Sequence, residues 1–231
     1  MNPVELIVFD NDGVLVDSER QANQLLAEML TEAGLPTTLE ESIRTYMGGT
    51  FDRVRRLAEE RAGFPLPEDF QDRFQRRLMD LLRTELRPMA GARALLESLA
   101  ARGTRFCVAS SSHRERLDLT LRVTGLAPLL GDRVFSADEV AAGKPAPDLF
   151  LHAAAGMGVD PARALVVEDS PLGVEAARAA GMRVVGFAAT TPADRLAGAD
   201  HVIASLDLLP GLIDAPVREP GRRTGIRHEK A

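Results

Sequence analysis

The first 19 residues hold the feature that most constrains the fold, a short apolar run that ends on two carboxylates. Leu6 to Phe9 is brief and contains β-branched and aromatic residues, as expected of a buried strand. Asp10 and Asp12 follow directly, and then Gly13. In an open α/β sheet, ligands bind at the carboxyl ends of the strands. Two acids at such an edge repel each other, unless a cation lies between them or one carries a proton.

A simple turn also accounts for this stretch when it is considered alone. Asp, Asn and Gly all favour turns, so residues 10–13 fit a tight connection after a strand. An EF-hand calcium loop fits poorly, because no acid stands at the spacing that such a loop needs. Other parts of the chain must therefore decide between a turn and a site.

Composition limits the classes of protein that these 231 residues can form. Apolar residues make up 45% of the chain, which allows a sizeable core. A net charge of −6 argues against nucleic acid as a partner, and no apolar run is long enough to span a membrane. The single cysteine, Cys107, is expected to be a buried apolar residue. With no secretory signal pattern, we expect a soluble cytoplasmic monomer.

Lysine is rare in this chain, which makes one lysine informative. Only Lys144 and Lys230 are lysines among 28 basic residues, and the others are arginines. Arginine is therefore the usual surface cation in this chain. A lysine in the middle of the chain, at position 144, indicates a place where a compact ammonium is needed and a planar guanidinium does not fit.

Residues 18–87 have helical periodicity and no convincing strand. Ser18 with Gln21, and Thr38 with Glu41, have the spacing of a capping box at the start of a helix. We predict four helices, over about residues 18–33, 38–47, 51–62 and 67–86.

From residue 91 onward, the pattern alternates between helix and strand. Helices are predicted at about 92–101, 112–123, 147–157 and 171–180. Strands are predicted at 105–109, 133–135, 164–167 and 183–187, with a last short strand and helix within 201–213. This alternation implies an α/β fold with a parallel sheet and right-handed crossovers.

The helical block separates the first strand from the rest of the sheet, so we interpret it as an insertion. Residues 1–17 and 88–215 would form the α/β core, and residues 18–87 a helical cap. The connecting segments, 14–18 and 83–90, are a natural pair of hinges. Residues 216–231 contain almost nothing apolar and are expected to be a disordered tail.

Polar residues stand at four of the predicted strand or loop ends. They are Asp10 and Asp12, the run Ser110, Ser111 and Ser112, then Lys144, and finally the pair Glu168 and Asp169. Taken singly, each also fits a common structural role, such as a helix cap or a surface lysine. Together they supply carboxylates, a hydroxyl and an ammonium at one edge of a sheet. Oxygen ligands without His or Cys favour Mg²⁺, and a cation and an ammonium facing a carboxylate suit a phosphate group.

These residues resemble the four motifs of the haloacid dehalogenase superfamily, in its branch of phosphatases with a helical cap. The motifs correspond to residues 9–19, 109–110, 143–148, and 167–170 with Gly173 and 176–177. The resemblance covers about residues 4–213. It implies a Rossmann-like catalytic core, Mg²⁺ as cofactor and hydrolysis of a small phosphorylated metabolite.

The resemblance also implies a role for each motif residue. Asp10 would be the nucleophile that forms an aspartyl-phosphate, and Asp12 would protonate the leaving oxygen and then activate water. Ser110 and Lys144 would bind the phosphoryl oxygens. The implied metal ligands are Asp10, the backbone carbonyl of Asp12, Asp169, and Glu168 either directly or through water.

Two alternatives within and outside this family remain. Asp12 argues against dehalogenation, which needs no proton donor for a leaving oxygen. A β-phosphoglucomutase would carry a His and an Arg in the cap, where this chain has Ala22 and Phe51, although Arg53 could substitute. A receiver-like signalling domain would also combine acids, a hydroxyl and a lysine, but such domains are shorter and lack a cap. Hydrolysis is therefore the favoured interpretation.

The cap is expected to choose the substrate. Candidate substrate-binding residues are Gly49, Thr50 and Arg53 from the cap, with Ser111, Ser112, His113 and Arg114 from the core. An arginine-rich cap with one Tyr and no Trp suggests a small polar phosphate, such as a sugar or sugar-acid phosphate.

Overall fold

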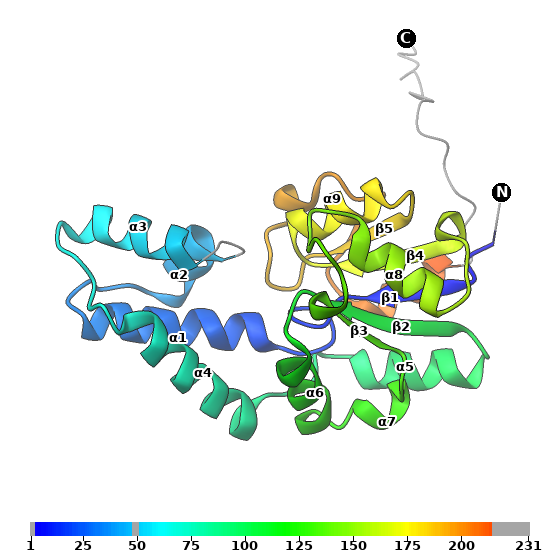
Figure 1. Cartoon of the computed structure of the whole chain (residues 1–231), viewed down its shortest axis with the longest axis horizontal. Coiled ribbons are helices and arrows are strands. Elements are labelled where there is room, and N and C mark those ends of the chain that lie inside the picture. Colours follow the sequence, from blue (N-terminus) through cyan, green and yellow to red (C-terminus); the bar gives the residue numbers. More distant parts are fainter. Residues whose placement is uncertain (1–2, 48–50, 214–231) are drawn as a thin grey trace, which may run out of the picture.

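A six-stranded parallel sheet lies at the centre of the computed structural model, which describes residues 3–47 and 51–213 (Figure 1). The strand order is β3-β2-β1-β4-β5-β6, and every neighbouring pair is parallel. The strands are β1 (Leu6–Phe9), β2 (Arg105–Ser110), β3 (Val134–Ser136), β4 (Ala164–Glu168), β5 (Arg183–Phe187) and β6 (His201–Ile203). The predicted α/β fold is confirmed.

β1 is buried on both faces, because its side chains alternate between two apolar clusters. Ile7 and Phe9 pack in the cluster that includes α5 and α6, and Leu6 and Val8 pack in the one that includes α8 and α9. None of the four is exposed at all. The core helices are α5 (Ala92–Ala101), α6 (Arg114–Val123), α7 (Ala127–Leu130), α8 (Asp148–Gly156), α9 (Pro171–Ala179) and α10 (Leu209–Ile213). β1 therefore ends in the middle of a rigid sheet.

Four helices lie to one side of the sheet (Figure 1). They are α1 (Ser18–Glu32), α2 (Leu39–Tyr46), α3 (Phe51–Ala62) and α4 (Phe70–Glu85). The predicted capping box at Thr38 and Glu41 is confirmed, with both reciprocal hydrogen bonds present. We refer to α1–α4 as the cap, while the division of the chain into two domains stays a prediction.

The two segments that join the cap to the core run side by side. The backbone N–H of Asp17 donates to the carbonyl of Arg87 at 3.0 Å, and that of Met89 donates to the carbonyl of Leu15 at 2.8 Å. Val16 and Pro88 form an antiparallel bridge between them. The connection is thus a short two-stranded ribbon rather than two independent loops.

Several predicted boundaries and one predicted cap are wrong. Ser18 does not cap α1: the N-cap is Asp17, without a side-chain bond, and the Ser18 hydroxyl donates to Asp12 instead. α4 begins at Phe70 rather than near residue 67, because a turn closed by the hydrogen bond from Phe70 N–H to the Pro67 carbonyl precedes the helix. α6 begins at Arg114 rather than at Ser112, since the serine run continues as a loop. The short α7 was not predicted.

Short 3₁₀ helices complete the flanks of the sheet. They are η1 (Ala137–Glu139), η2 (Pro161–Arg163), η3 (Ala193–Leu196) and η4 (Leu206–Leu208). Candidate residues Gly49 and Thr50, and the predicted tail 216–231, lie outside the described residues. In the described part, no helix combines the length and apolar character needed to cross a membrane.

Removal of a buried cap side chain should destabilise the cap. Leu30 on α1 is fully buried, so Leu30→Ala should lower the free energy of unfolding by about 2–5 kcal/mol through lost burial and a cavity. Urea denaturation followed by circular dichroism measures this. Glu28→Ala, at an exposed position of the same helix, is the control and should change stability by less than about 0.5 kcal/mol. Equal effects of the two changes would contradict the packing described.

Candidate active site

β1 delivers Asp10 to the middle of the carboxyl edge of the sheet. Phe9 is in register with Val108 of β2 and Val167 of β4, so the next residue along stands between the ends of both neighbours. The backbone N–H of Asp10 donates to the carbonyl of Val167 at 2.9 Å. Only 6% of Asp10 is exposed. The side chain is therefore held at one place by the sheet itself.

Lys144 joins Asp10 to a second carboxylate. Its Nζ lies 2.6 Å from Asp10 Oδ1 and 2.6 Å from Glu168 Oε1, and 4.8 Å from the ring centre of Phe150. The lysine side chain is almost completely buried. Burial disfavours the ammonium, but the two carboxylates outweigh this and raise the pKa of Lys144 above its ordinary value. The lysine is thus a permanent buried cation.

One lysine does not neutralise all the acids around it. Burial raises the pKa of Asp10 to about 7, against the lowering effect of Lys144, and nearby Glu168 and Asp12 raise it further. Burial, followed by repulsion from Glu168 and Asp10, raises the pKa of Asp169 well above its ordinary value. Both carboxyl groups therefore resist ionisation here, and a bound cation would favour their ionised forms.

Two glycines allow the acids to approach the backbone. A Cβ at Gly13 would collide with the carboxylate of Asp169, and a Cβ at Gly173 would collide with that of Glu168. Gly13 also has a positive φ of 78°, which favours glycine. The carboxylate of Asp169 consequently lies against the loop that carries Asp12.

The donor set fits a hard divalent cation with few protein ligands. Asp10 and Asp169 are buried carboxyl groups with raised pKa values, and the carboxylate of Asp169 lies close to Gly13 in the loop after β1. Within residues 3–47 and 51–213, no group of three His, Cys, Asp or Glu side chains is arranged to hold an ion. Both carboxylate oxygens of Glu168 have partners within the protein, since Oε1 accepts from Lys144 and Oε2 from the N–H of Ser170, each at 2.6 Å. A direct bond from Glu168 to a metal therefore finds no support in this geometry.

Asp12 lies in a different environment from Asp10. Its Oδ1 accepts from Ser18 Oγ at 2.6 Å and from Arg116 Nη2 at 2.8 Å, and its Oδ2 accepts from Ser112 Oγ at 2.9 Å. Burial opposes ionisation of this carboxyl, but Arg116 and the hydrogen bonds prevail and lower its pKa. Two carboxylates two residues apart thus have pKa values shifted in opposite directions, because their surroundings differ.

A cavity of about 660 Å³ lies over these residues. Its wall combines the catalytic edge of the sheet with the cap, through Met47 of the loop after α2, and Gln75 and Met79 of α4. The remaining lining residues are Asp10, Asp12, Glu19, Ser110, Ser111, Ser112, His113, Glu115, Arg116, Lys144, Glu168, Asp169, Ser170, Pro171, Leu172, Thr191 and Arg195. A ligand in this cavity would contact the core and the cap at once.

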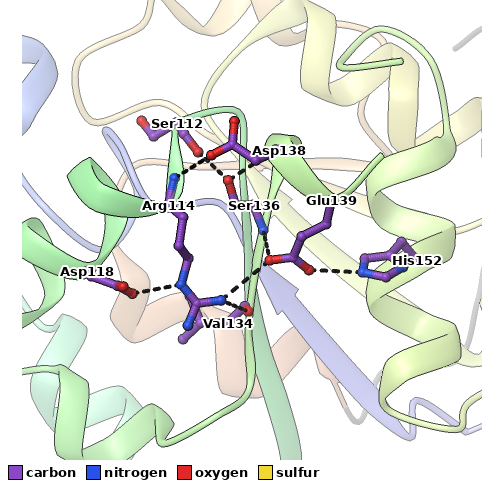
Figure 2. A network of polar contacts seen from close by, with 8 residues as sticks. All are labelled: Ser112, Arg114, Asp118, Val134, Ser136, Asp138, Glu139 and His152. Carbon is purple, nitrogen blue, oxygen red and sulfur yellow. Dashed lines mark hydrogen bonds and ion pairs between the residues drawn. The ribbon is translucent and has the colours of Figure 1, made fainter. Parts of the chain in front are cut away.

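The predicted substrate-binding residues do not all reach the cavity. Ser111, Ser112 and His113 line it, but Arg114 and Arg53 do not. Arg114 points the other way, toward Asp118 at 2.9 Å and Glu139 at 3.4 Å (Figure 2). Arg53 donates to the carbonyl of Thr45 at 3.3 Å within the cap. The backbone N–H of Arg114, the first residue of α6, donates to Asp138 at 2.8 Å.

Three residues of the site escaped the sequence analysis. Ser18 was assigned to a helix cap, and Arg116 is one of many arginines with no motif around it. Glu19 belongs to the matched first motif but was given no role. In the helix predicted over residues 112–123, Arg116 would lie one turn after Ser112, and this spacing was the one hint in the sequence that Arg116 belongs to the site.

Known proteins resemble this chain along most of its length. The family model of haloacid dehalogenase-like hydrolases matches residues 4–181. The probable pseudouridine-5'-phosphatase of Drosophila melanogaster is 38% identical over 77% of this chain and 79% of its own length. The (DL)-glycerol-3-phosphatase 1 of Arabidopsis thaliana is 36% identical over 87% of this chain and 70% of its own. The chain spans only 18% of another relative, the SUPPRESSOR OF QUENCHING 1 protein of Arabidopsis thaliana, at 32% identity over 81% of this chain.

Solved structures have the same fold. A haloacid dehalogenase-like protein from Agrobacterium tumefaciens has a TM-score of 0.85 and 42% identity, over 91% of this chain and 97% of that one. A family hydrolase from Deinococcus radiodurans, with bound phosphate and sodium, has a TM-score of 0.84 and 35% identity, over 92% and 96%. The chain belongs to the haloacid dehalogenase-like hydrolases. Within that family it is a phosphatase, a hydrolase of phosphoric monoesters.

A methyl group at Gly173 should disturb the Lys144 cluster. It would collide with the Glu168 carboxylate, so Gly173→Ala should lower the free energy of unfolding by about 1–3 kcal/mol through overpacking and reduce phosphatase activity. Gly211→Ala is the matched control, because a Cβ there meets nothing within 4 Å. Chemical denaturation and an activity assay check both variants. Unchanged stability and activity in Gly173→Ala would contradict the packing of Glu168.

Proposed function

We propose that the protein is an Mg²⁺-dependent phosphomonoesterase that hydrolyses a small organic phosphate through an aspartyl-phosphate on Asp10. The observation that carries the proposal is the contact of Lys144 Nζ with Asp10 Oδ1 at 2.6 Å, in a cavity that also contains Asp12, Ser110 and Asp169. The lysine orients the carboxylate and offsets the charge that a phosphoryl group brings.

In the first step, a carboxylate oxygen of Asp10 attacks phosphorus, and the bond from phosphorus to the leaving oxygen breaks. Asp12 gives its proton to that oxygen, so an alcohol leaves. In the second step, Asp12 takes a proton from water as the water oxygen attacks phosphorus. The acyl-phosphate bond breaks, which releases inorganic phosphate and restores Asp10.

The environment of Asp12 suits the second step better than the first. Arg116 lowers the pKa of this carboxyl, which favours the ionised base. To act as an acid, Asp12 must carry a proton when phosphoryl transfer begins. We therefore infer that the contact with Arg116 loosens when the substrate enters.

We propose that Asp10, Asp169 and the backbone carbonyl of Asp12 hold Mg²⁺, with Glu168 acting through water. The raised pKa values of Asp10 and Asp169 support this, because burial, together with repulsion between neighbouring carboxylates, disfavours their ionised forms, and a bound cation would offset both effects. When bound, the ion supplies positive charge opposite the phosphoryl oxygens. Ser110 and Lys144 are assigned to those oxygens.

The cavity favours a hydroxylated leaving group. Glu19 lines it, and its carboxyl group makes no hydrogen bond that the described residues provide. Burial, with the negative charge of Asp12 beside it, raises the pKa of Glu19 to about 7. A carboxyl group at the wall of a cavity can form a hydrogen bond with a polar group of a ligand. A substrate hydroxyl near the ester oxygen provides one, so we propose a polyol, sugar or sugar-acid phosphate; relatives named for pseudouridine 5'-phosphate and glycerol 3-phosphate are consistent with this.

Hydrolysis remains favoured over a phosphosugar mutase. A mutase must grip phosphate a second time, and the expected cap positions do not provide such a grip. Phe51 packs against Phe70 and Phe74, with ring centres 6.2 and 5.7 Å away, and Arg53 does not line the cavity. Membership in a hydrolase family also leaves no support for a receiver-like signalling domain.

Loss of the nucleophile should abolish turnover. Asp10→Asn should reduce hydrolysis of p-nitrophenyl phosphate in MgCl₂ by at least about 10³-fold, because the covalent route is closed. Asp132→Asn, at an exposed turn outside the cavity, is the control and should retain full activity. If Asp10→Asn stays active, the proposed function is wrong.

Magnesium should stabilise the folded protein. An ion that binds only the folded chain adds about 2.7 kcal/mol at 100 times its Kd, so MgCl₂ should raise the Tm relative to EDTA. Asp169→Asn should reduce this increase, and Asp132→Asn should not. Thermal scans of the three proteins provide the measurement, and an increase that is identical in Asp169→Asn would remove that residue from the metal site.

Glu19 should affect substrates that carry a hydroxyl. Glu19→Ala should raise the KM for glycerol 3-phosphate roughly tenfold, since one hydrogen bond to a charged group is worth about 1.5–3 kcal/mol. Glu28→Ala, on the exposed face of the same helix, is the control. A steady-state assay of phosphate release gives KM, and an unchanged value in Glu19→Ala would contradict the assignment.

A further inference from the structure

A polar network surrounds the turn after β3, and it reaches the residues assigned to phosphate and metal only through Ser112. It begins at the end of β3, where Ser136 is completely buried (Figure 2). Ser136 and Glu139 form a capping box around η1: Ser136 Oγ accepts from the N–H of Asp138 at 3.2 Å, and the N–H of Ser136 donates to Glu139 Oε1 at 3.2 Å. The catalytic scheme gives this turn no task.

The turn is attached to the loop that enters the cavity. Ser136 Oγ donates to the backbone carbonyl of Ser112 at 2.8 Å. Because this oxygen already accepts from Asp138 N–H, its single proton is directed to Ser112. Asp138 also accepts from the N–H of Arg114 at 2.8 Å and contacts His113 Nδ1 at 2.7 Å. Residues 112, 113 and 114 are therefore all held from behind by one turn.

Further contacts stabilise the turn from outside. Arg114 bridges Asp118, Glu139 and the carbonyl of Val134, and His152 of α8 lies 2.9 Å from the second oxygen of Glu139 (Figure 2). These pairs are partly exposed and each is worth little alone. As a group they tie the turn to both α6 and α8.

On the side that faces the cavity, the Ser112 loop contacts Asp12, the proposed acid–base residue. Ser112 Oγ donates to Asp12 Oδ2 at 2.9 Å, and the N–H of Ser112 donates to Ser110 Oγ at 3.1 Å. The carbonyl of Ser112 thus accepts from Ser136, and its hydroxyl donates to Asp12. A shift of its backbone moves the hydroxyl that orients the Asp12 carboxyl.

We propose that Ser136 is a positioning residue for Asp12, and that it acts through Ser112. The proposal rests on the function proposed above, in which Asp12 protonates the leaving oxygen. Displacement of Asp12 should slow esters whose leaving group needs a proton, and should affect much less an ester whose leaving group departs as a stable anion. A general loss of folded protein would slow both equally.

Phenyl phosphate and p-nitrophenyl phosphate form the matched pair of substrates. They have similar shapes, but phenolate is a far stronger base than p-nitrophenolate and depends more on a proton donor. The value of kcat/KM covers the step in which the leaving group departs. Ser136→Ala should lower kcat/KM for phenyl phosphate about tenfold or more, since misplaced acid–base groups lose part of a 10²–10⁴-fold effect, and that for p-nitrophenyl phosphate by less than about threefold.

Ser205→Ala is the matched control. Ser205 caps the short helix η4 in the same way, with Oγ accepting from the N–H of Asp207 at 3.3 Å, and does not line the cavity. It should leave both esters unchanged. Asp138→Ala, at an exposed position, removes the other attachment of the loop without touching the buried core, and should shift the ratio of the two esters in the same direction as Ser136→Ala.

A double variant tests whether Ser136 works through Ser112. Ser112→Ala removes the hydroxyl on Asp12 and should show the same selective loss. If Ser136 affects Asp12 only through Ser112, the double variant Ser112→Ala with Ser136→Ala should have the same kcat/KM for phenyl phosphate as Ser112→Ala alone. Losses that multiply would overturn the proposed route.

The outcomes separate the two proposals. If the wild-type protein hydrolyses neither ester in MgCl₂, the proposed function fails and this inference fails with it. If Asp12→Ala is selective between the esters but Ser136→Ala is not, the function stands and the positioning role of Ser136 is wrong. Selective loss in Ser136→Ala, with full activity in Ser205→Ala, supports the role.

Discussion

The buried ammonium of Lys144 is the interaction on which the rest of the site depends. It lies 2.6 Å from both Asp10 and Glu168, with almost no exposed surface. Removing a charge from water is costly, and a buried ion pair is stable only when every partner is satisfied. A single ammonium cannot pair with all the carboxyl groups around it. A second cation, bound beside Asp10 and Asp169, would therefore favour the ionised forms of these carboxyls.

The site also depends on how the chain returns to one edge of the sheet. β1, β2 and β4 are adjacent, so the residues after them meet although they are far apart in sequence. The loop before α8 adds Lys144, and the first turn of α1 adds Ser18 and Glu19. Residues of the core and of the cap therefore both lie around Asp12. The turn after β3 binds the other side of the Ser112 loop, through Ser136.

The sequence predicted the parts of this arrangement that depend on local pattern. The strand at Leu6–Phe9, the α/β alternation and the capping box at Thr38 follow from periodicity and capping rules, and all are present. Ser18 shows the limit of such rules, because a distant carboxylate competed for its hydroxyl. Arg116 shows another limit: its importance arises from tertiary contact with Asp12, 104 residues away, and no local pattern records that.

The position of β1 has a consequence for the order in which the protein can form during synthesis. This strand leaves the ribosome before the other five strands of the sheet, but its partners are residues 105–108 and 164–167. The cap helices α1–α4 lie between β1 and both partner strands in the chain, so they emerge while β1 is still unpaired, and non-local pairing of this kind is slow. Asp10 therefore meets Lys144 only after the first 144 residues have been synthesised, and a nascent chain interrupted before that point lacks the catalytic centre.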